Sequence, residues 1–354
     1  MSSVENNFIR GVDLSSANQM QDCGIIFYDR DGAKNVYQII SEQGGNLARI
    51  RIWVNPNWQD ADGKVNHYSN YADVKLSIQQ AKANNMKVML DFHYSDTWAD
   101  PSAQIIPKAW EKYLGDTDSL AARVYLYSND VLSRLALAQL SPDYVQIGNE
   151  IDREIMVPWD NKGYPINWVR NAALLNAGIK AARKEGNGQA KIIIHIANAS
   201  NANHWFWAAK NAGVTDFDII GLSYYAQWSE LNIAELGQNI KALKKRYTKD
   251  VMIVETALPW TDKWNDQLHN VLAVMPKGYQ PASPENQARW LLDLKKEAIK
   301  QSVLGIIYWE PAWVSNACSA SGFKQKSGSS WENATFFDFD NKLIENGGVR
   351  FLAE

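Results

Sequence analysis

Two glutamates in this sequence, Glu150 and Glu255, each follow a short apolar run of the kind that forms a buried β-strand. Hydrolysis of a glycosidic bond needs two carboxyl groups, one protonated to assist the leaving oxygen and one ionised to attack the anomeric carbon. A single glutamate at a strand end is more often a solvated terminus or the partner of a buried arginine. Two of them at one edge of a fold predict a retaining glycosidase, with Glu150 as acid/base and Glu255 as nucleophile. Their carboxyl groups are then expected ~5 to 5.5 Å apart.

Arg49 and Arg51 lie on one face of a predicted strand, because side chains in a strand alternate with a period of two. A buried cation is costly unless a carboxylate pairs with it. We therefore expect at least one of these arginines beside Glu255, where it lowers the pKa of that carboxyl group and keeps it ionised while Glu150 stays protonated. For the more deeply placed arginine, a structural ion-pair network is the expected role.

A polar and aromatic segment, residues 91–100, follows the third predicted strand and is expected to line the cleft. The amide of Asn149 can hydrogen-bond the 2-hydroxyl group of a sugar, an interaction that strengthens in the transition state. One tyrosine of the Tyr224-Tyr225 pair is expected to hydrogen-bond the nucleophile, and Trp309 to form the floor beneath the scissile sugar. The candidate substrate contacts are Arg51, Asp91, His93, Asp96, Trp98, Asn149, Tyr224, Trp309 and Trp313.

Two residues near the predicted cleft have a competing interpretation. His93 is about as well explained as a core histidine whose hydrogen bonds are satisfied. Glu310 is a third carboxyl group, which we rank below the other two because it precedes Pro311 and can hold the last loop in place. The five histidines include no pair at metal-ligand spacing, so no metal ligand is assigned.

These side chains converge only if the strands that carry them belong to one sheet. Short apolar runs alternate with amphipathic helical patterns along the chain, which predicts parallel strands with crossover helices. The predicted strands span residues 8–15, 46–54, 87–94, 144–150, 191–197, 217–225, 250–257 and 303–310. The clearest predicted helices span residues 72–85, 120–139, 167–185, 233–247 and 284–301.

Eight strand-helix units in 354 residues predict an α/β fold, a single-domain (β/α)8 TIM barrel, with Glu150 and Glu255 on strands four and seven. Long loops should follow the C-terminal ends of strands, on the face where such barrels carry their active sites. These loops are residues 95–119, 152–166, 259–283 and 311–335. We assign residues 8–354 to the barrel and residues 1–7 to a disordered or appended N-terminus. A doubly wound open sheet is the competing architecture, but no glycine-rich nucleotide-binding motif follows the first strand.

Composition narrows the range of partners. A formal net charge of -3 leaves no basic excess, so nucleic acid is not an expected partner. No apolar stretch approaches the ~20 residues needed to cross a bilayer. Fifteen tryptophans and fifteen tyrosines suit a ligand with flat apolar faces, such as a sugar. Cys23 and Cys318 permit one disulfide or none.

Several segments together resemble glycoside hydrolase family 53, the arabinogalactan endo-β-1,4-galactanases, over almost the whole chain. The resembling segments are residues 10–15, 49–56, 91–101, 148–150, 221–225, 254–257, 308–313 and 330–333. The resemblance implies a hydrolase that cuts internal β-1,4-galactosidic bonds of galactan or arabinogalactan, the side chains of pectin, by double displacement. It implies the same roles for Glu150 and Glu255 and places Trp98, Trp309 and Trp313 against galactose units.

The resemblance also implies the setting of the enzyme. Members of the family are usually exported, so we expect an extracellular, cell-surface or periplasmic protein whose export signal is absent from this chain, and a monomer. Catalysis should need no cofactor. Bacterial members often hold a structural calcium ion with alternating Asp, His and Asn ligands in the loops after strands seven and eight. Residues 264–270 lack those alternating acids, so calcium stays an open alternative.

Three other functions compete with this one. Another retaining β-glycanase of the same barrel clan would act on mannan or glucan, and only the resemblance, not the carboxyl pair, identifies galactose. A non-catalytic glycan-binding barrel would keep the aromatic cleft but lack one carboxyl group. An aldolase or isomerase for sugar phosphates would be expected to have a strand-end lysine or a glycine-rich phosphate site.

Overall fold

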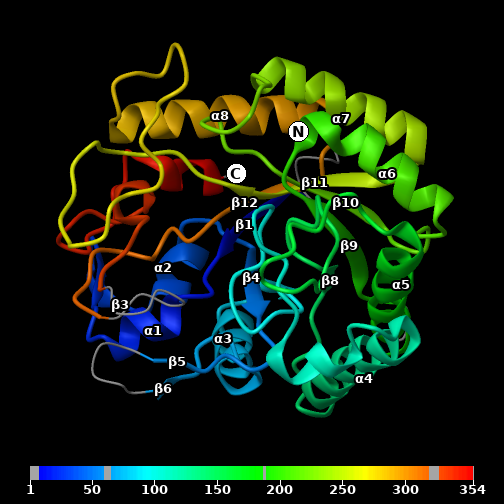
Figure 1. The fold of residues 1–354 in the computed structure, drawn as a ribbon. Helices are drawn as coiled ribbons and strands as arrows, with labels where there is room; N and C mark the ends of the chain where they lie inside the picture. The colour runs from blue at the N-terminus through cyan, green and yellow to red at the C-terminus, as the bar shows by residue number, and fades with distance from the viewer. Residues whose placement is uncertain (1–7, 60–64, 186–188, 319–326, 354) are drawn as a thin grey trace.

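The computed structural model describes residues 8–59, 65–185, 189–318 and 327–353, and the N-terminal segment 1–7 lies outside the described residues. Eight parallel strands form a closed barrel in the order β1-β12-β11-β10-β9-β8-β7-β4 (Figure 1). The strands are β1 (Ile9–Asp13), β4 (Leu47–Ile52), β7 (Lys87–Phe92), β8 (Tyr144–Ile147), β9 (Lys191–Ile196), β10 (Ile219–Ser223), β11 (Asp250–Thr256) and β12 (Gly305–Tyr308). Each lies within a span predicted from the sequence, and the (β/α)8 fold is confirmed.

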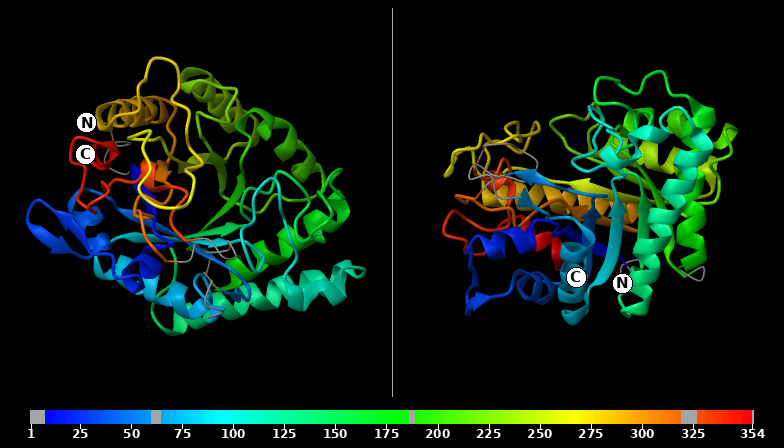
Figure 2. Two further views of the ribbon diagram at one scale, coloured as in Figure 1. Left: turned by 60° about the vertical axis from the view of Figure 1, so that its left-hand side comes forward. Right: turned by 60° about the horizontal axis from the view of Figure 1, so that its bottom comes forward.

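Helices surround the barrel, as two further views show (Figure 2). Those that the sequence predicts are α3 (Tyr71–Ala83), α4 (Thr117–Leu137), α5 (Trp168–Glu185), α7 (Ile233–Tyr247) and α8 (Pro284–Lys300). Three shorter helices complete the set: α1 (Ala17–Asp22), α2 (Val36–Glu42) and α6 (Ala202–Asn211). Two hairpins, β2 (Phe27–Asp29) with β3 (Gly32–Lys34) and β5 (Trp58–Gln59) with β6 (Val65–Asn66), lie outside the barrel. The 3-10 segments are η2 (Lys108–Tyr113), η3 (Ala199–Asn201), η4 (Glu332–Ala334) and η5 (Gly348–Leu352).

Local sequence signals fix where the helices begin. The side chain of Ser283 caps α8 by accepting a hydrogen bond from the backbone N–H of Asn286, and Pro284 takes the first turn, where a backbone N–H would have no helical partner. The side chain of Asn232 and that of Glu235 form a capping box at the start of α7. These caps set the ends of helices that pack against the barrel.

The interior of the barrel has an apolar floor and a polar layer above it. The floor is the buried cluster of Ile9, Leu47, Met89, Ile193, Ile219, Met252, Val254 and Ile307. The polar layer is formed by Asp13, Arg49, Asp91, Gln146 and His195, each at most 1% exposed. Gly305 permits close contact at the floor, because a Cβ atom there would lie 2.3 Å from the Cβ of Ile9. The floor closes the barrel from below, and the polar layer faces its C-terminal end.

The loops after β11 and β12 lie side by side over the C-terminal end of the barrel, drawn yellow and orange in Figures 1 and 2. The backbone N–H of Val271 donates to the carbonyl oxygen of Ser330, and that of Trp260 donates to Asn333. A disulfide between Cys23 and Cys318 joins the β12 loop to the segment just after α1. The two cysteines therefore meet, which the sequence left open.

None of the helices in the described part of the chain is long and apolar enough to cross a membrane.

We predict that loss of the disulfide lowers the free energy of unfolding by about 2–5 kcal/mol, because Cys23 and Cys318 close a loop with a sequence separation of 295. The measurement compares denaturant midpoints of the wild type, the wild type under reducing conditions, and the Cys23→Ala/Cys318→Ala double variant. The reduced wild type and the double variant should have the same denaturant midpoint. A midpoint that does not change on reduction would contradict the prediction.

Candidate active site

The two predicted carboxyl groups lie together at the C-terminal end of the barrel. Glu150 lies three residues beyond the end of β8, and Glu255 lies in β11. One carboxylate oxygen of each, together with a ring nitrogen of His195, all lie within 4.8 Å of one another. Both glutamates line a cavity of about 360 Å³. This spacing suits attack by one carboxylate on the bond that the other protonates.

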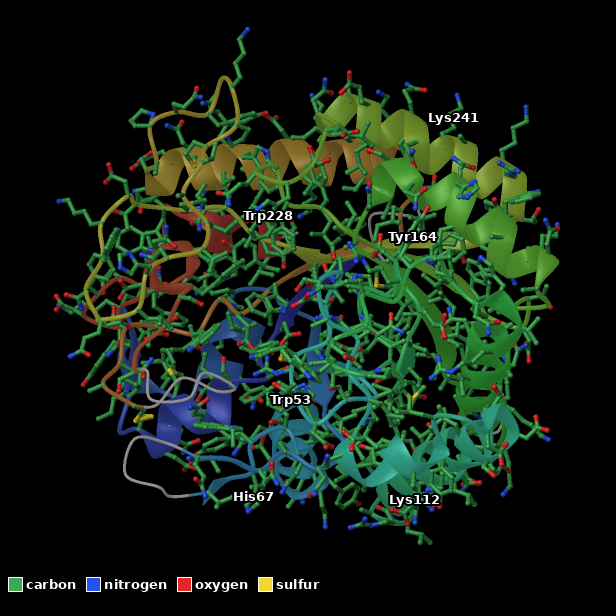
Figure 3. All side chains as sticks on the ribbon, viewed as in Figure 1. Trp53, His67, Lys112, Tyr164, Trp228 and Lys241 are labelled. Atoms are coloured by element: carbon green, nitrogen blue, oxygen red, sulfur yellow. A yellow bond between two sulfur atoms is a disulfide. The ribbon has the colours of Figure 1, made fainter. Side chains whose placement is uncertain are left out.

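Five tryptophans and one tyrosine line the cavity. Trp98 lies 5.9 Å from Trp309 and 6.3 Å from Trp313, measured between ring centroids, and Trp309 lies 4.6 Å from Trp331. Trp228 lines the cavity with a side chain that is 55% exposed (Figure 3). The lining residues are His93, Trp98, Ala99, Asp100, Asn149, Glu150, Tyr225, Trp228, Glu255, Val271, Trp309, Trp313, Ser330 and Trp331.

Irregular backbone positions both glutamates. The pairing of β10 with β11 runs from Leu222 opposite Ile253 to Ser223 opposite Glu255, so Val254 is an extra residue in β11. This bulge lets Val254 join the apolar floor while Glu255, the next residue, still faces the polar layer. Glu150 has a φ of 46°, a left-handed conformation that is uncommon for a residue with a side chain and recurs at functional sites.

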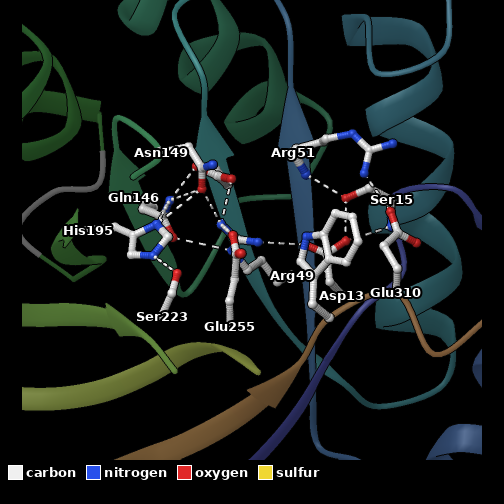
Figure 4. A network of polar contacts seen from close by, with 12 residues as sticks. Asp13, Ser15, Arg49, Arg51, Gln146, Asn149, His195, Ser223, Glu255 and Glu310 are labelled. Atoms are coloured by element: carbon white, nitrogen blue, oxygen red, sulfur yellow. Dashed lines mark hydrogen bonds and ion pairs between the residues drawn. The ribbon is translucent and has the colours of Figure 1, made fainter. Parts of the chain in front are cut away.

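Arg49 connects the polar layer to the candidate nucleophile. Its guanidinium nitrogens lie 2.8 Å from carboxylate oxygens of Asp13, Asp91 and Glu255 (Figure 4). The expectation that one of the two arginines neighbours Glu255 is confirmed, and Arg49, the deeper of the two, also forms the expected buried ion-pair network with Asp13 and Asp91. Arg49 precedes Arg51 along the strand, yet it is the arginine that contacts Glu255, because the bulge in β11 brings Glu255 to the level of Arg49.

Arg51 is buried and does not line the cavity. It forms an ion pair with Glu310, and its guanidinium carbon lies 4.2 Å from the ring centroid of Trp98. Glu310 also accepts a hydrogen bond from the hydroxyl group of Ser16. Arg51 thus supports Trp98 from behind, and the third carboxyl group near the cleft belongs to this structural pair.

As expected, one tyrosine of the Tyr224-Tyr225 pair contacts Glu255, and it is Tyr225; Tyr224, a candidate substrate contact, does not line the cavity. The Tyr225 hydroxyl group donates to Oε2 of Glu255 at 3.0 Å. Tyr224 instead donates to the carbonyl oxygen of Leu231 and stacks on Trp290, outside the cavity. The reason is the alternation of the strand, which turns Ser223 and Tyr225 inward and Tyr224 outward.

The two candidate aspartates lie behind the cavity wall rather than in it. Asp91 accepts hydrogen bonds from Arg49 and Gln146 within the polar layer. Asp96 accepts from the backbone N–H groups of Asn55 and Lys108, so it links the loop after β4 to its own loop after β7. Both positions fit a structural role better than a direct contact with substrate.

His93 and Asn149 line the cavity with defined hydrogen bonds. Nδ1 of His93 lies 3.2 Å from two donors, Nε1 of Trp53 and the backbone N–H of Ala99, so it must be unprotonated. Nε2 of His93 then donates to Asp91. Asn149 accepts from Arg49 through Oδ1 and donates to the carbonyl oxygen of Ala99 through Nδ2, which leaves one amide hydrogen for a ligand.

The two carboxyl groups differ in how strongly they hold a proton. Burial raises the pKa of Glu255 to about 7, while Arg49 and the Tyr225 hydroxyl group oppose that rise. Burial and the negative charge of Glu255 raise the pKa of Glu150 well above its ordinary value. Glu150 therefore keeps its proton to higher pH than Glu255, in agreement with an acid/base beside a nucleophile.

Five residues that sequence reasoning did not select complete the site: His195, Ser223, Tyr225, Trp228 and Trp331. Strand alternation contained the signal for Ser223 and Tyr225. His195 lies within the apolar run of β9, one residue before its end, where an isolated histidine is typical of a core position. Trp228 and Trp331 lie in loops, where no periodic pattern indicates which side chains face the cleft.

A metal ion fits the described residues poorly. Glu150, His195 and Glu255 form the one cluster of three potential ligands in the described part of the chain, but the Ser223 hydroxyl group lies between His195 and Glu150 and hydrogen-bonds both.

Residues 264–270, which correspond to the calcium-binding region of bacterial family members, are held in place by hydrogen bonds. The Asp266 carboxylate accepts the backbone N–H groups of Leu268, Asn316 and Ser329. Glu332 accepts the N–H of Asn265. Because these carboxylates accept hydrogen bonds from backbone N–H groups, they do not form a set of oxygen ligands around a calcium ion.

Comparison with known proteins gives consistent results. A family model described as "Glycosyl hydrolase family 53" matches residues 9–346. An arabinogalactan endo-β-1,4-galactanase of Cellvibrio japonicus is 44% identical over 342 residues, which cover 95% of this chain and 88% of that protein. An endo-β-1,4-galactanase of Bacillus subtilis is 29% identical over 354 residues, which cover 95% of this chain and 79% of that protein.

Solved structures agree with the sequence relatives. The GH53 catalytic domain of Ignisphaera aggregans superposes with a TM-score of 0.88 at 32% identity and covers 98% of this chain and 97% of that one. One of two fungal β-1,4-galactanases superposes with a TM-score of 0.80 at 28% identity, with coverages of 97% and 98%.

We predict that Tyr225→Phe moves the acidic limb of the pH profile of kcat/KM to higher pH. The Tyr225 hydroxyl group donates to the Glu255 carboxylate and favours its ionised form, so loss of this donor raises the pKa of Glu255. The rate should fall by about 10- to 100-fold at a pH below that pKa, the usual effect of losing a hydrogen bond to a charged group.

Tyr224→Phe is the matched control, because its hydroxyl group hydrogen-bonds a backbone carbonyl away from the cavity. It should lose about 1 kcal/mol of stability and leave the pH profile in place. Equal pH profiles for the wild type and Tyr225→Phe would refute the assignment.

Proposed function

The chain belongs to glycosyl hydrolase family 53, and from this premise we propose that it is an endo-acting β-1,4-galactanase in which Glu150 is the acid/base and Glu255 the nucleophile. The observation that carries the proposal is the pair of carboxyl groups, one buried and one partly exposed, within 4.8 Å of each other in a cavity lined by tryptophans. The substrate, galactan or arabinogalactan, follows from the relatives, several of which are named arabinogalactan endo-β-1,4-galactanases.

The first half of the reaction forms a glycosyl-enzyme. An oxygen of Glu255 attacks the anomeric carbon while Glu150 gives its proton to the glycosidic oxygen, which leaves with the rest of the chain. Arg49 and Tyr225 hold the Glu255 carboxylate in place and favour its ionised form. The separation of the two groups supports this route, because an inverting enzyme needs ~6.5 to 9.5 Å between its carboxyl groups to admit a water molecule.

The second half of the reaction releases the sugar. Glu150, now ionised, takes a proton from a water molecule that attacks the anomeric carbon, and the bond to Glu255 breaks. The high pKa of Glu150 suits both halves, because a group that binds its proton strongly is also an effective base once it is ionised. The product keeps the configuration of the substrate after two inversions.

Asn149 and the tryptophans supply the sugar contacts. Asn149 has one amide hydrogen left to bind the 2-hydroxyl group, and hydrogen bonds at this group are among those that strengthen in the transition state. The rings of Trp98, Trp309 and Trp313 offer flat apolar faces along one wall. Trp228 and Trp331 also line the cavity, and Trp331 packs against Trp309.

We further propose that the protein acts outside the cell, as a monomer and without a cofactor. The disulfide between Cys23 and Cys318 supports an oxidising compartment, because such bonds rarely persist in the reducing cytosol. The hydrogen bonds of Asp266 and Glu332 hold the two long loops without an ion. Activity should therefore survive treatment with a chelator.

The deciding experiment measures the release of reducing ends from β-1,4-galactan by the wild type, Glu150→Ala and Glu255→Ala. Each variant should lose at least about 10³-fold, since each removes a group that takes part in bond breaking. Mannan, xylan and cellulose are the control substrates. If the wild type cuts one of these and leaves galactan intact, the enzyme is another retaining β-glycanase; if it cuts none, a glycan-binding barrel remains.

Azide separates the two roles when an activated aryl β-galactoside is the substrate. With Glu255→Ala, azide takes the place of the nucleophile and should give the α-galactosyl azide in one inverting step. With Glu150→Ala, azide attacks the glycosyl-enzyme and should give the β-galactosyl azide. Exchanged products would reverse the assignment of the two glutamates.

A further inference from the structure

We propose that His195 and Ser223 are positioning residues: they form a one-directional hydrogen-bond relay that keeps Oε1 of Glu150 an acceptor and places the transferable proton on Oε2. This inference rests on the proposed role of Glu150 as the acid/base. Neither residue needs to touch substrate in this role.

The relay consists of two short hydrogen bonds between neighbouring strands. The Ser223 hydroxyl oxygen, at the end of β10, lies 2.7 Å from Oε1 of Glu150. Nε2 of His195, at the end of β9, lies 2.9 Å from the same hydroxyl oxygen. His195 is fully buried and Ser223 is 4% exposed, so the relay is sheltered from solvent.

The surroundings of His195 decide the direction of these bonds. Nδ1 lies 3.3 Å from the backbone N–H of Glu150 and 3.1 Å from the side-chain amide nitrogen of Gln146, and both of these are donors. Among the described residues, the acceptor that lies near Nδ1 is Oδ1 of Asn149, at 3.1 Å, and that oxygen already accepts from Arg49 at 2.7 Å. An unprotonated Nδ1 can accept a hydrogen bond from the backbone N–H of Glu150, whereas a protonated Nδ1 would place two donors against each other.

The proton of the imidazole ring therefore lies on Nε2, and the rest of the relay follows. Nε2–H donates to the Ser223 oxygen, and the Ser223 hydroxyl hydrogen is left to donate to Oε1 of Glu150. A doubly protonated ring does not fit, because burial and the nearby Arg49 hold the pKa of His195 well below its ordinary value. The direction is thus set by backbone and amide donors that do not titrate.

This arrangement has two consequences for Glu150. A proton on Oε1 would point at the hydroxyl hydrogen of Ser223, so the neutral carboxyl group carries its proton on Oε2. The same imidazole ring also accepts the backbone N–H of Glu150, which lies in the left-handed conformation with a φ of 46°. One buried ring thereby holds the residue at its backbone and, through Ser223, at its carboxyl group.

The kinetic test compares Ser223→Ala with Ser223→Thr, which keeps a hydroxyl group. The substrates are two aryl β-galactobiosides, a 2,4-dinitrophenyl one that leaves without protonation and a 4-methylphenyl one that needs it. Ser223→Ala should lower kcat/KM for the second substrate by about 10- to 100-fold and for the first by no more than about twofold. Ser223→Thr should recover most of the loss.

The pH profile gives a second readout that a merely structural role would not change. Ser223 donates to Glu150 and favours its ionised form, so its removal raises the pKa of Glu150. The basic limb of kcat/KM, where Glu150 loses its proton, should then move to higher pH in Ser223→Ala and return in Ser223→Thr. Equal losses on both substrates with an unmoved basic limb would overturn the relay.

A direct observation of the tautomer tests the proposal apart from activity. Nitrogen NMR of the wild type labelled with 15N-histidine should show His195 neutral with its proton on Nε2, assigned by comparison with His195→Gln. A proton on Nδ1 would reverse the relay and overturn the proposal. This result distinguishes the two claims, since a protein that cuts no galactoside but shows the Nε2 tautomer would refute the proposed function and not the hydrogen-bond direction.

Discussion

One buried guanidinium group, that of Arg49, holds the polar half of the barrel together. It meets carboxylates of Asp13, Asp91 and Glu255, which come from β1, β7 and β11. A buried cation without such partners, or carboxylates without the cation, would cost several kcal/mol. The ion pairs therefore require a strand register that brings acids of the two neighbours of β4, β1 and β7, and of β11 across the barrel to the height of Arg49, and the candidate nucleophile is part of the charge balance of the fold.

The catalytic geometry arises where regular structure stops. The extra residue Val254 in β11 allows apolar packing below and a carboxylate above from consecutive positions. On the opposite strand, Glu150 adopts a left-handed backbone that would be unfavourable without the contacts around it. The strands fix where each carboxyl group lies, and the bulge at Val254 and the left-handed backbone of Glu150 fix the direction in which each side chain points.

Periodicity predicted the fold because every barrel strand repeats the same apolar pattern and each helix has one apolar face. The carboxyl pair could be predicted from the sequence for a similar reason, because an acidic residue at the end of an apolar strand stands out from the pattern. Tyr225 could have been chosen over Tyr224 by applying the alternation that was used for Arg49 and Arg51. His195 could not have been chosen from the sequence, because an isolated histidine in an apolar run is typical of a core position. Its hydrogen-bond partners, Gln146, Asn149 and Ser223, come from other segments of the chain.

The disulfide between Cys23 and Cys318 makes most of the chain a covalent ring. Proteolytic cleavage of a folded protein begins at its surface loops, such as the one that carries the exposed Trp159. A single cut between the two cysteines opens the ring but does not divide the molecule, so both parts stay joined at the crosslink. The hydrogen-bonded barrel then has the chance to remain assembled, and one nick need not end the working life of the enzyme.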